Sequence, residues 1–187
     1  MSGPKRARKP KRARTNRCVS FDGTNDLVSI SDYDISASGT GDFSISLWFK
    51  TDSTTDITST AFVNKEESRS VYWQFYISGA DKATFLAKNG GTTVLNYVSE
   101  AQSNDLAGEW NHIVYTCDRD TGQAVYINGA ALTEVTDSIA DTTTSVNNTA
   151  DISLGKTGGT FLDGRIAEYC TFNKALSASE VSLLYRK

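Results

Sequence analysis

The chain has 187 residues, of which 39% are apolar and 22% are charged, and these proportions exclude a wholly disordered protein. Three cysteines are too few for a small disulfide-rich scaffold. No apolar run reaches the ~18 residues of a membrane-spanning helix, so no membrane partner is expected. Residues 1–17 carry eight Lys or Arg and no acid, a charge of +8, whereas residues 18–187 have a net charge of −11. The sequence therefore predicts a basic arm, residues 1–17, and an acidic folded domain, residues 18–187.

The basic arm has no large apolar side chain after Met1, so it is predicted to be of the intrinsically disordered type. It also lacks the apolar stretch of ~7 residues that a secretory signal needs. Clustered cations bind polyanions by releasing counterions from phosphates, although a solvated tail or a nuclear-localisation segment has a similar composition. The predicted contacts with nucleic acid, or with an acidic protein surface, are Lys5, Arg6, Arg8, Lys9, Lys11, Arg12, Arg14 and Arg17.

From Cys18 onward, short apolar runs alternate with turn residues. In FSISLWFK (43–50) every odd-numbered residue is large and apolar, and in VYWQFYIS (71–78) Val, Trp, Phe and Ile alternate with Tyr, Gln, Tyr and Ser. This period of two is typical of half-buried strands. Further strands are predicted at 82–88, 92–99, 110–118, 123–128, 131–135, 151–156 and 164–172.

Turn residues predict how these strands connect. Asn89-Gly90-Gly91 and Asn128-Gly129 supply the positive φ that tight hairpins require. Ser177 and Glu180 form an S-x-x-E capping box, which predicts one short C-terminal helix. The segments 51–60 and 136–150 are rich in Thr, Ser, Asp and Asn and are predicted to be loops. About ten strands at hairpin spacing predict an all-β fold, an antiparallel sandwich or barrel.

Four stretches in order resemble the laminin-G-like, concanavalin-A-like jelly-roll family. They are FDGTNDLVSI (21–30), FSISLWFK (43–50), the hairpin from WNHI (110–113) to Asn128-Gly129, and GRIAE (164–168) followed by NKALS (173–177). The resemblance covers residues 18–187 and implies a two-sheet β-sandwich with jelly-roll topology. It implies little about function, because lectins, adhesion modules, enzymes and structural proteins share this fold.

The residues do not favour an enzyme. The single histidine, His112, matches the family's structural Trp-x-His position, and Cys117 would face the opposite side of the same strand. Glucanases of this fold resemble one another in a strand with acids at alternate positions, but here Glu66 and Glu67 are adjacent. We therefore expect no catalytic residues and no zinc, and we expect the three cysteines to be thiols.

Calcium is the metal that the resemblance implies, because many members of the family hold it. The positions similar to ligand-bearing ones are Asp22 and Asn25, with Asp163 as a further oxygen donor. The closing signature of the family has Asp where this chain has Ala167, so one oxygen ligand is missing, although Glu168 is a candidate substitute. The alternative is that Asp22 and Asn25 only form the turn at Gly23.

Three aromatic residues fall on strand faces opposite the predicted core rows, namely Trp48, Tyr72 and Tyr76. Aromatic rings combined with amides can stack on sugar rings and form hydrogen bonds with them, so these residues are candidates for carbohydrate binding. The alternative is that both faces of a central sheet are partly covered, where tyrosine is common.

Two functional hypotheses follow. The first is a non-enzymatic virion structural protein, a capsid or capsid-decoration subunit, whose basic arm binds nucleic acid or a neighbouring subunit. It implies self-assembly and a location in the virion and, during assembly, in the host cytoplasm or nucleus. The alternative is a lectin-like carbohydrate-binding or adhesion module with glycan partners and a calcium-dependent form.

Overall fold

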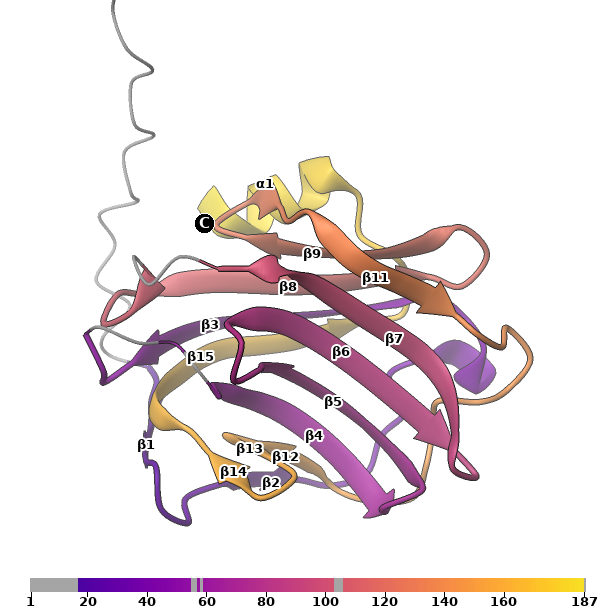
Figure 1. Ribbon diagram of the computed structural model, residues 1–187, viewed down its shortest axis with the longest axis horizontal. Helices are drawn as coiled ribbons and strands as arrows, with labels where there is room; N and C mark the ends of the chain where they lie inside the picture. The colour runs from indigo at the N-terminus through magenta and orange to yellow at the C-terminus, as the bar shows by residue number, and fades with distance from the viewer. Residues whose placement is uncertain (1–16, 55–56, 58, 103–105, 187) are drawn as a thin grey trace, which may run out of the picture.

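The computed structural model describes residues 17–54, 57, 59–102 and 106–186. Within these residues, antiparallel strands form two large sheets packed face to face as a β-sandwich (Figure 1). The six-stranded sheet contains, in order across it, β1 (Val19–Asp22), β15 (Asp163–Phe172), β3 (Phe43–Thr51), β8 (Asn111–Asp118), β9 (Gly122–Ile127) and β10 (Ala130–Ala131). The seven-stranded sheet contains β11 (Glu134–Ile139), β7 (Thr92–Ala101), β6 (Lys82–Asn89), β5 (Val71–Ile77), β4 (Ala61–Ser68), β12 (Ile152–Leu154) and β2 (Val28–Ile30). The predicted all-β jelly-roll sandwich is confirmed.

The core lies between the two sheets and is rich in aromatic rings. Phe85 of the seven-stranded sheet stacks on Tyr115 of the six-stranded sheet, with ring centroids 4.0 Å apart, and Phe43 and Phe75 pack around this pair. All four side chains are fully buried. Burying each one stabilises the fold by roughly 1.5–3 kcal/mol, so the alternating rows identified in the sequence form the main core.

The C-terminal helix, α1 (Ala178–Arg186), covers the outer face of the six-stranded sheet (Figure 1). Its predicted capping box is present, because the backbone N–H of Ser177 donates to Glu180 and the N–H of Glu180 donates to Ser177 Oγ. Val181 packs against Val114 of β8 and Leu176. Because α1 lies there, β3 is buried on both faces rather than half-buried as predicted.

Four parts of the strand pattern differ from the prediction. Strand β4 was not predicted, although it pairs with both β5 and β12. The predicted strand 131–135 is divided between β10 in one sheet and β11 in the other. Strand β11 extends to Ile139, inside a segment predicted to be a loop. Within the described residues, a short hairpin, β13 (Lys156–Thr157) and β14 (Thr160–Phe161), also joins β12 to β15.

The predicted glycine-containing turns are confirmed. Asn128 and Gly129 have φ values of 54° and 80°, as a type I′ hairpin requires, and Gly90 and Gly91 also have positive φ. A 3₁₀ turn, η1 (Ala37–Gly39), precedes β3. In the part of the chain that the structure describes, no helix is both long and apolar enough to cross a membrane.

Candidate functional site

The candidate site is the outer face of the seven-stranded sheet, centred on β5. The alternation of β5 buries Trp73, Phe75 and Ile77 in the core. It leaves Tyr72, Gln74 and Tyr76 half-buried on the opposite face. At about 3.3 Å per residue, this row is about 13 Å long.

The strands beside β5 place polar side chains next to this row. On β4, Asn64 and Glu66 are the register partners of Gln74 and Tyr72. On β6, Thr84, Leu86 and Lys88 are the partners of Tyr76, Gln74 and Tyr72. Directly opposed side chains lie about 4.5–5.5 Å apart at Cβ. Asn64 and Thr84 are buried, whereas Glu66 is exposed and Lys88 is half-buried, so the carboxylate and the ammonium group are the flanking groups within reach of a bound molecule. None of the exposed large apolar side chains in the described residues belongs to β4, β5, β6 or β7.

A depression of about 220 Å³ opens at the Tyr72 end of the row. Glu66, Arg69, Tyr72 and Gln74 line it, and Gly158 at the tip of the β13–β14 hairpin forms its rim. The depression therefore combines an aromatic ring, an amide, a carboxylate and a guanidinium, drawn from the β4–β5 hairpin and from a segment about 90 residues later in the chain.

Burial and hydrogen bonding set the chemistry of the polar groups at this face. Burial, and then the neighbouring Tyr72, raise the pKa of Tyr76, while a hydrogen bond with Thr84 opposes the shift. Tyr76 is therefore a neutral hydrogen-bonding group at physiological pH. The carboxylate of Glu66 is oriented by Asn64, whose Nδ2 donates to Glu66 Oε2 over 3.2 Å.

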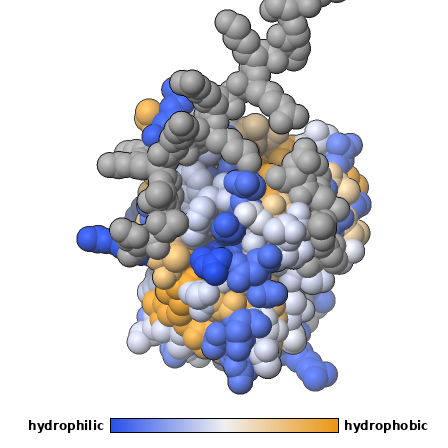
Figure 2. Space-filling view, turned by 90° about the vertical axis from the view of Figure 1, so that its left-hand side faces the viewer, coloured by the Kyte–Doolittle hydropathy of each residue, from blue (hydrophilic) through white to orange (hydrophobic). Residues whose placement is uncertain are grey.

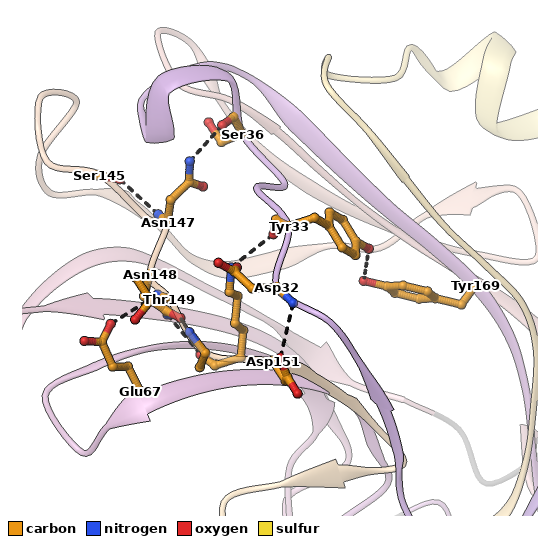
Figure 3. Close-up of polar contacts among 12 residues, drawn as sticks. Asp32, Tyr33, Ser36, Glu67, Ser145, Asn147, Asn148, Thr149, Asp151 and Tyr169 are labelled. Carbon is orange, nitrogen blue, oxygen red and sulfur yellow. Dashed lines mark hydrogen bonds and ion pairs between the residues drawn. The ribbon is translucent and has the colours of Figure 1, made fainter.

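A polar network fixes the edge of the sheet beside the site (Figure 3). The backbone N–H of Thr149 donates to Glu67 Oε2, and Asn148 Nδ2 donates to the carbonyl oxygen of Lys65. The backbone N–H of Asp32 donates to Asp151. These bonds hold the segment before β12 against β4. They therefore fix the strand that carries Glu66, one of the residues that line the depression.

Among the predicted carbohydrate-binding residues, the structure brings Tyr72 and Tyr76 together but not Trp48. Trp48 belongs to β3 in the other sheet and is only 4% exposed. Its ring lies 5.8 Å from the ring of Tyr185 of α1 and 5.0 Å from His112. Helix α1 therefore covers the face of β3 on which the sequence analysis expected Trp48 to be accessible to a sugar.

The predicted calcium ligands lie around the β1–β15 pair. Asp22 and Asp163 are register partners. Asp22 Oδ1 accepts a hydrogen bond from the backbone N–H of Thr24, which agrees with the alternative that Asp22 forms the turn at Gly23. Asn25 lies in the following turn. In residues 17–54, 57, 59–102 and 106–186, no three His, Cys, Asp or Glu side chains are grouped closely enough to hold a metal ion. Calcium binding stays a prediction.

The histidine and the core thiol lie on opposite faces of β8, as predicted. His112 is 2% exposed beneath α1, where its Nε2 lies 2.9 Å from Ser46 Oγ. Cys117 faces the core, and burial raises the pKa of its thiol to about 12. All three cysteines are thiols.

Most of the basic arm falls outside the described residues. This applies to Lys5, Arg6, Arg8, Lys9, Lys11, Arg12 and Arg14, whereas Arg17 is described and exposed. Arg17 borders a second depression of about 240 Å³ with a mainly apolar lining that includes Val19, Phe21 and Leu154. Figure 2 shows apolar residues gathered on this side of the molecule, where β1 lies. The arm's role in binding nucleic acid or an acidic surface stays a prediction.

The sequence analysis missed four residues that line the depression, namely Glu66, Arg69, Gln74 and Gly158. Gln74 was identifiable, because it lies between Tyr72 and Tyr76 on the predicted outward face. Glu66 and Arg69 were missed because β4 was not predicted. No sequence signal places the β13–β14 hairpin beside β5.

Comparisons with known proteins agree with the fold and identify the family of the chain. The model of the concanavalin A-like lectin/glucanases superfamily matches residues 22–182. No curated protein is similar enough in sequence to match.

The solved structures that resemble this chain include two toxin binding domains and one domain of an enzyme. The binding domain of Paraclostridial Mosquitocidal Protein 1 is 15% identical, with a TM-score of 0.64 over 88% of this chain and 42% of that one. The binding domain of botulinum neurotoxin DC, solved with rat synaptotagmin II, is 17% identical, with a TM-score of 0.64 over 88% and 41%. This chain therefore spans about two fifths of these toxin domains.

Domain 4 of AbnA, an extracellular arabinanase from Geobacillus stearothermophilus solved with arabinotriose, is 16% identical, with a TM-score of 0.59 over 89% of this chain and 87% of that one. At these identities the likeness establishes the shared fold. Together with the family model, which matches most of the sequence, it shows that the chain belongs to the concanavalin A-like lectin/glucanases superfamily.

Proposed function

We propose that this protein is a carbohydrate-binding module without catalytic activity, and that its ligand lies along the Tyr72–Gln74–Tyr76 row. One observation carries the proposal: two half-buried tyrosines and an amide lie in line on the outer face of the sheet, beside a depression with a carboxylate and a guanidinium. Tyrosine presents an apolar ring and a polar hydroxyl. Gln74 can donate and accept hydrogen bonds. A sugar ring needs this combination of an apolar surface and hydrogen-bonding groups.

The comparisons favour a binding module over a coat protein. One structural neighbour was solved with arabinotriose, and others are toxin binding domains, one of them solved with synaptotagmin II. For the present chain, the polar outer face of β4–β7 supports a sugar rather than a protein partner. A protein interface of standard size has an apolar, fully buried centre, and the exposed large apolar residues of the described chain lie away from these strands.

Binding without catalysis is supported by the positions of the histidine and of the thiol on the same strand. His112 lies beneath α1, and Cys117 is directed into the core on the opposite face of the same strand. A thiol whose pKa is about 12 is not a nucleophile at neutral pH.

Titration calorimetry against a panel of plant and bacterial oligosaccharides tests the proposal. Tyr72→Ala and Tyr76→Ala are each expected to weaken binding of the best ligand by about tenfold, because each removes one stacking surface. Tyr185→Ala is the control, since it removes a tyrosine from the outer face of the other sheet. Equal affinities for the wild type and both β5 variants would refute the proposed site.

The role of the arm in a virion is a separate proposal, and it is supported by the charge difference between +8 in residues 1–17 and −11 in the domain. Particle size and the ratio of absorbance at 260 and 280 nm, measured at low and high salt, test it. A large particle that carries salt-sensitive nucleic acid would support it, and a nucleic-acid-free monomer would count against it.

A further inference from the structure

The Tyr72 end of the candidate site carries two cations. Lys88 of β6 is the direct register partner of Tyr72, and Arg69, in the β4–β5 turn, lines the depression together with Tyr72. The backbone N–H of Gly91 donates to the carbonyl oxygen of Ser70 over 2.9 Å, which ties the β4–β5 turn to the β6–β7 turn. Arg69 and Lys88 therefore flank the same ring from neighbouring hairpins.

Neither cation forms an ion pair with any residue in the described part of the chain. The two acids closest to Arg69 in the sequence have other hydrogen-bond partners. Glu66 accepts a hydrogen bond from Asn64, and Glu67 accepts one from the backbone of Thr149 (Figure 3). The site therefore presents two positive groups with unused donors, together with one oriented carboxylate.

Three other cations of the domain are paired, whereas Lys50, Lys82 and Lys156 also form no ion pair within the described residues but do not lie beside Tyr72. Lys65, Arg165 and Lys174 are each paired with an acid, and the domain as a whole has a net charge of −11. Most of the surface therefore repels anions. Two unpaired cations beside an aromatic ring make this end of the sheet selective for a ligand that carries negative charge at one point and hydroxyl groups elsewhere.

We propose that the ligand of this face is an acidic oligosaccharide whose anionic group lies between Arg69 and Lys88 while a neighbouring sugar ring stacks on Tyr72. This inference rests on the proposed carbohydrate-binding function and adds the class of sugar. The guanidinium of Arg69 has the planar fork that binds a carboxylate or sulfate through two parallel hydrogen bonds. Glu66 accepts hydrogen bonds from sugar hydroxyls, which an anionic group alone would not use.

The test measures binding of acidic sugars against neutral sugars of equal length. The acidic probes are trimeric galacturonate, an alginate-derived trimer and a heparin-derived oligosaccharide, and the neutral probes are galactotriose and mannotriose. The full-length chain is used with the seven Lys and Arg of residues 5–14 changed to Gln, because the arm would otherwise bind every polyanion. The uronate probes carry carboxylates alone, whereas the heparin probe carries both carboxylates and sulfates, so tighter binding of heparin than of both uronates would indicate sulfate recognition.

The expected result is a preference of at least tenfold for one acidic trimer, which is lost in Arg69→Gln/Lys88→Gln. Lys82→Gln is the matched control, since Lys82 lies on the same strand, about 20 Å from Lys88. The control should keep the preference, and raising the salt concentration should reduce it.

Each contrary result has a distinct meaning. Equal affinity for acidic and neutral trimers, or a preference that survives in Arg69→Gln/Lys88→Gln, would overturn this inference and leave the proposed function standing. Failure of every sugar to bind would overturn both. Tighter binding of a DNA oligonucleotide or of anionic vesicles, with the same dependence on Arg69 and Lys88, would also overturn the assignment to sugars.

Discussion

The ammonium group of Lys65 is buried inside the sandwich and forms an ion pair with Asp32, on the connector between β2 and β3. Lys65 is 1% exposed, on the same face of the sheet as the core residue Trp73, its register partner. Its Nζ also donates to the carbonyl oxygen of Tyr33 over 3.0 Å. A buried charge is tolerated only when it is paired and hydrogen-bonded, so this lysine depends on the connector.

Asp32→Ala is therefore expected to lower the free energy of unfolding by about 2–3 kcal/mol. Removing one partner of a buried pair costs about 3–5 kcal/mol, but Asp32 is 42% exposed, so water will hydrate part of the ammonium group. Urea denaturation measures the change. Adding Lys65→Met to Asp32→Ala should restore much of the loss, because it removes the unpaired charge. Equal stability of Asp32→Ala and wild type would show that the pair contributes nothing.

Gly155 is a position where the fold demands glycine. Its φ is +79°, and a Cβ there would lie 2.3 Å from Cε1 of Phe21 in the core. Gly155→Ala should destabilise the protein by about 3 kcal/mol, the sum of overpacking and a left-handed backbone. Gly158→Ala is the control, because its φ is +53° but a Cβ at this residue would have no atom within 4 Å. The free energy of unfolding of the control should fall by only about 1 kcal/mol. Equal losses of stability in the two variants would contradict the steric argument.

Strand periodicity predicted much of the core but did not reveal β4. Residues 61–65 of that strand are buried without alternation, because one face meets the core and the β13–β14 hairpin lies close to the strand. The charged residues that follow, such as Glu66 and Glu67, are exposed and resemble a loop in sequence. A short apolar run followed by charges has no period of two, so pattern analysis had no signal to use.

The candidate site was predicted in part for a similar reason. Tyr72 and Tyr76 follow from the alternation within one strand, which is local information. The position of Trp48 depends on α1 packing against β3 and β8, and the position of Gly158 depends on a hairpin that folds beside β5. Both are contacts between distant segments, and no spacing within one segment encodes them.

Two of the three thiols, Cys117 and Cys170, should differ in reactivity. Burial raises the pKa of Cys117 to about 12. Cys170 is exposed, although partial burial and Glu168 raise its pKa too. Iodoacetamide at pH 7.5 should therefore alkylate Cys170 in the native protein and leave Cys117 unmodified until denaturant is added. Peptide mass spectrometry over time measures both rates. Equal alkylation of Cys117 and Cys170 under native conditions would mean that the core opens far more readily than its packing implies.

The capping box of α1 should make the stability of the helix depend on pH. Lys174, and then the backbone N–H and hydroxyl of Ser177, lower the pKa of Glu180 from 4.5 to about 2. A carboxyl whose pKa is lowered in the folded state stabilises that state above its unfolded pKa, and the stabilisation is lost as the pH falls through the folded pKa. The loss is therefore expected between pH 4.5 and pH 2.

Glu180→Gln removes this titration and should unfold at a lower urea concentration than wild type at pH 7, with the difference shrinking as the pH falls toward 2. Lys174→Gln should reproduce part of the effect, because the hydrogen bond from Lys174 is the largest cause of the lowered pKa of Glu180. Because α1 covers Trp48, tryptophan fluorescence reports on its release from the sheet. A difference between Glu180→Gln and wild type that stayed constant from pH 7 to pH 2 would show that Glu180 stabilises the helix by means other than its charge.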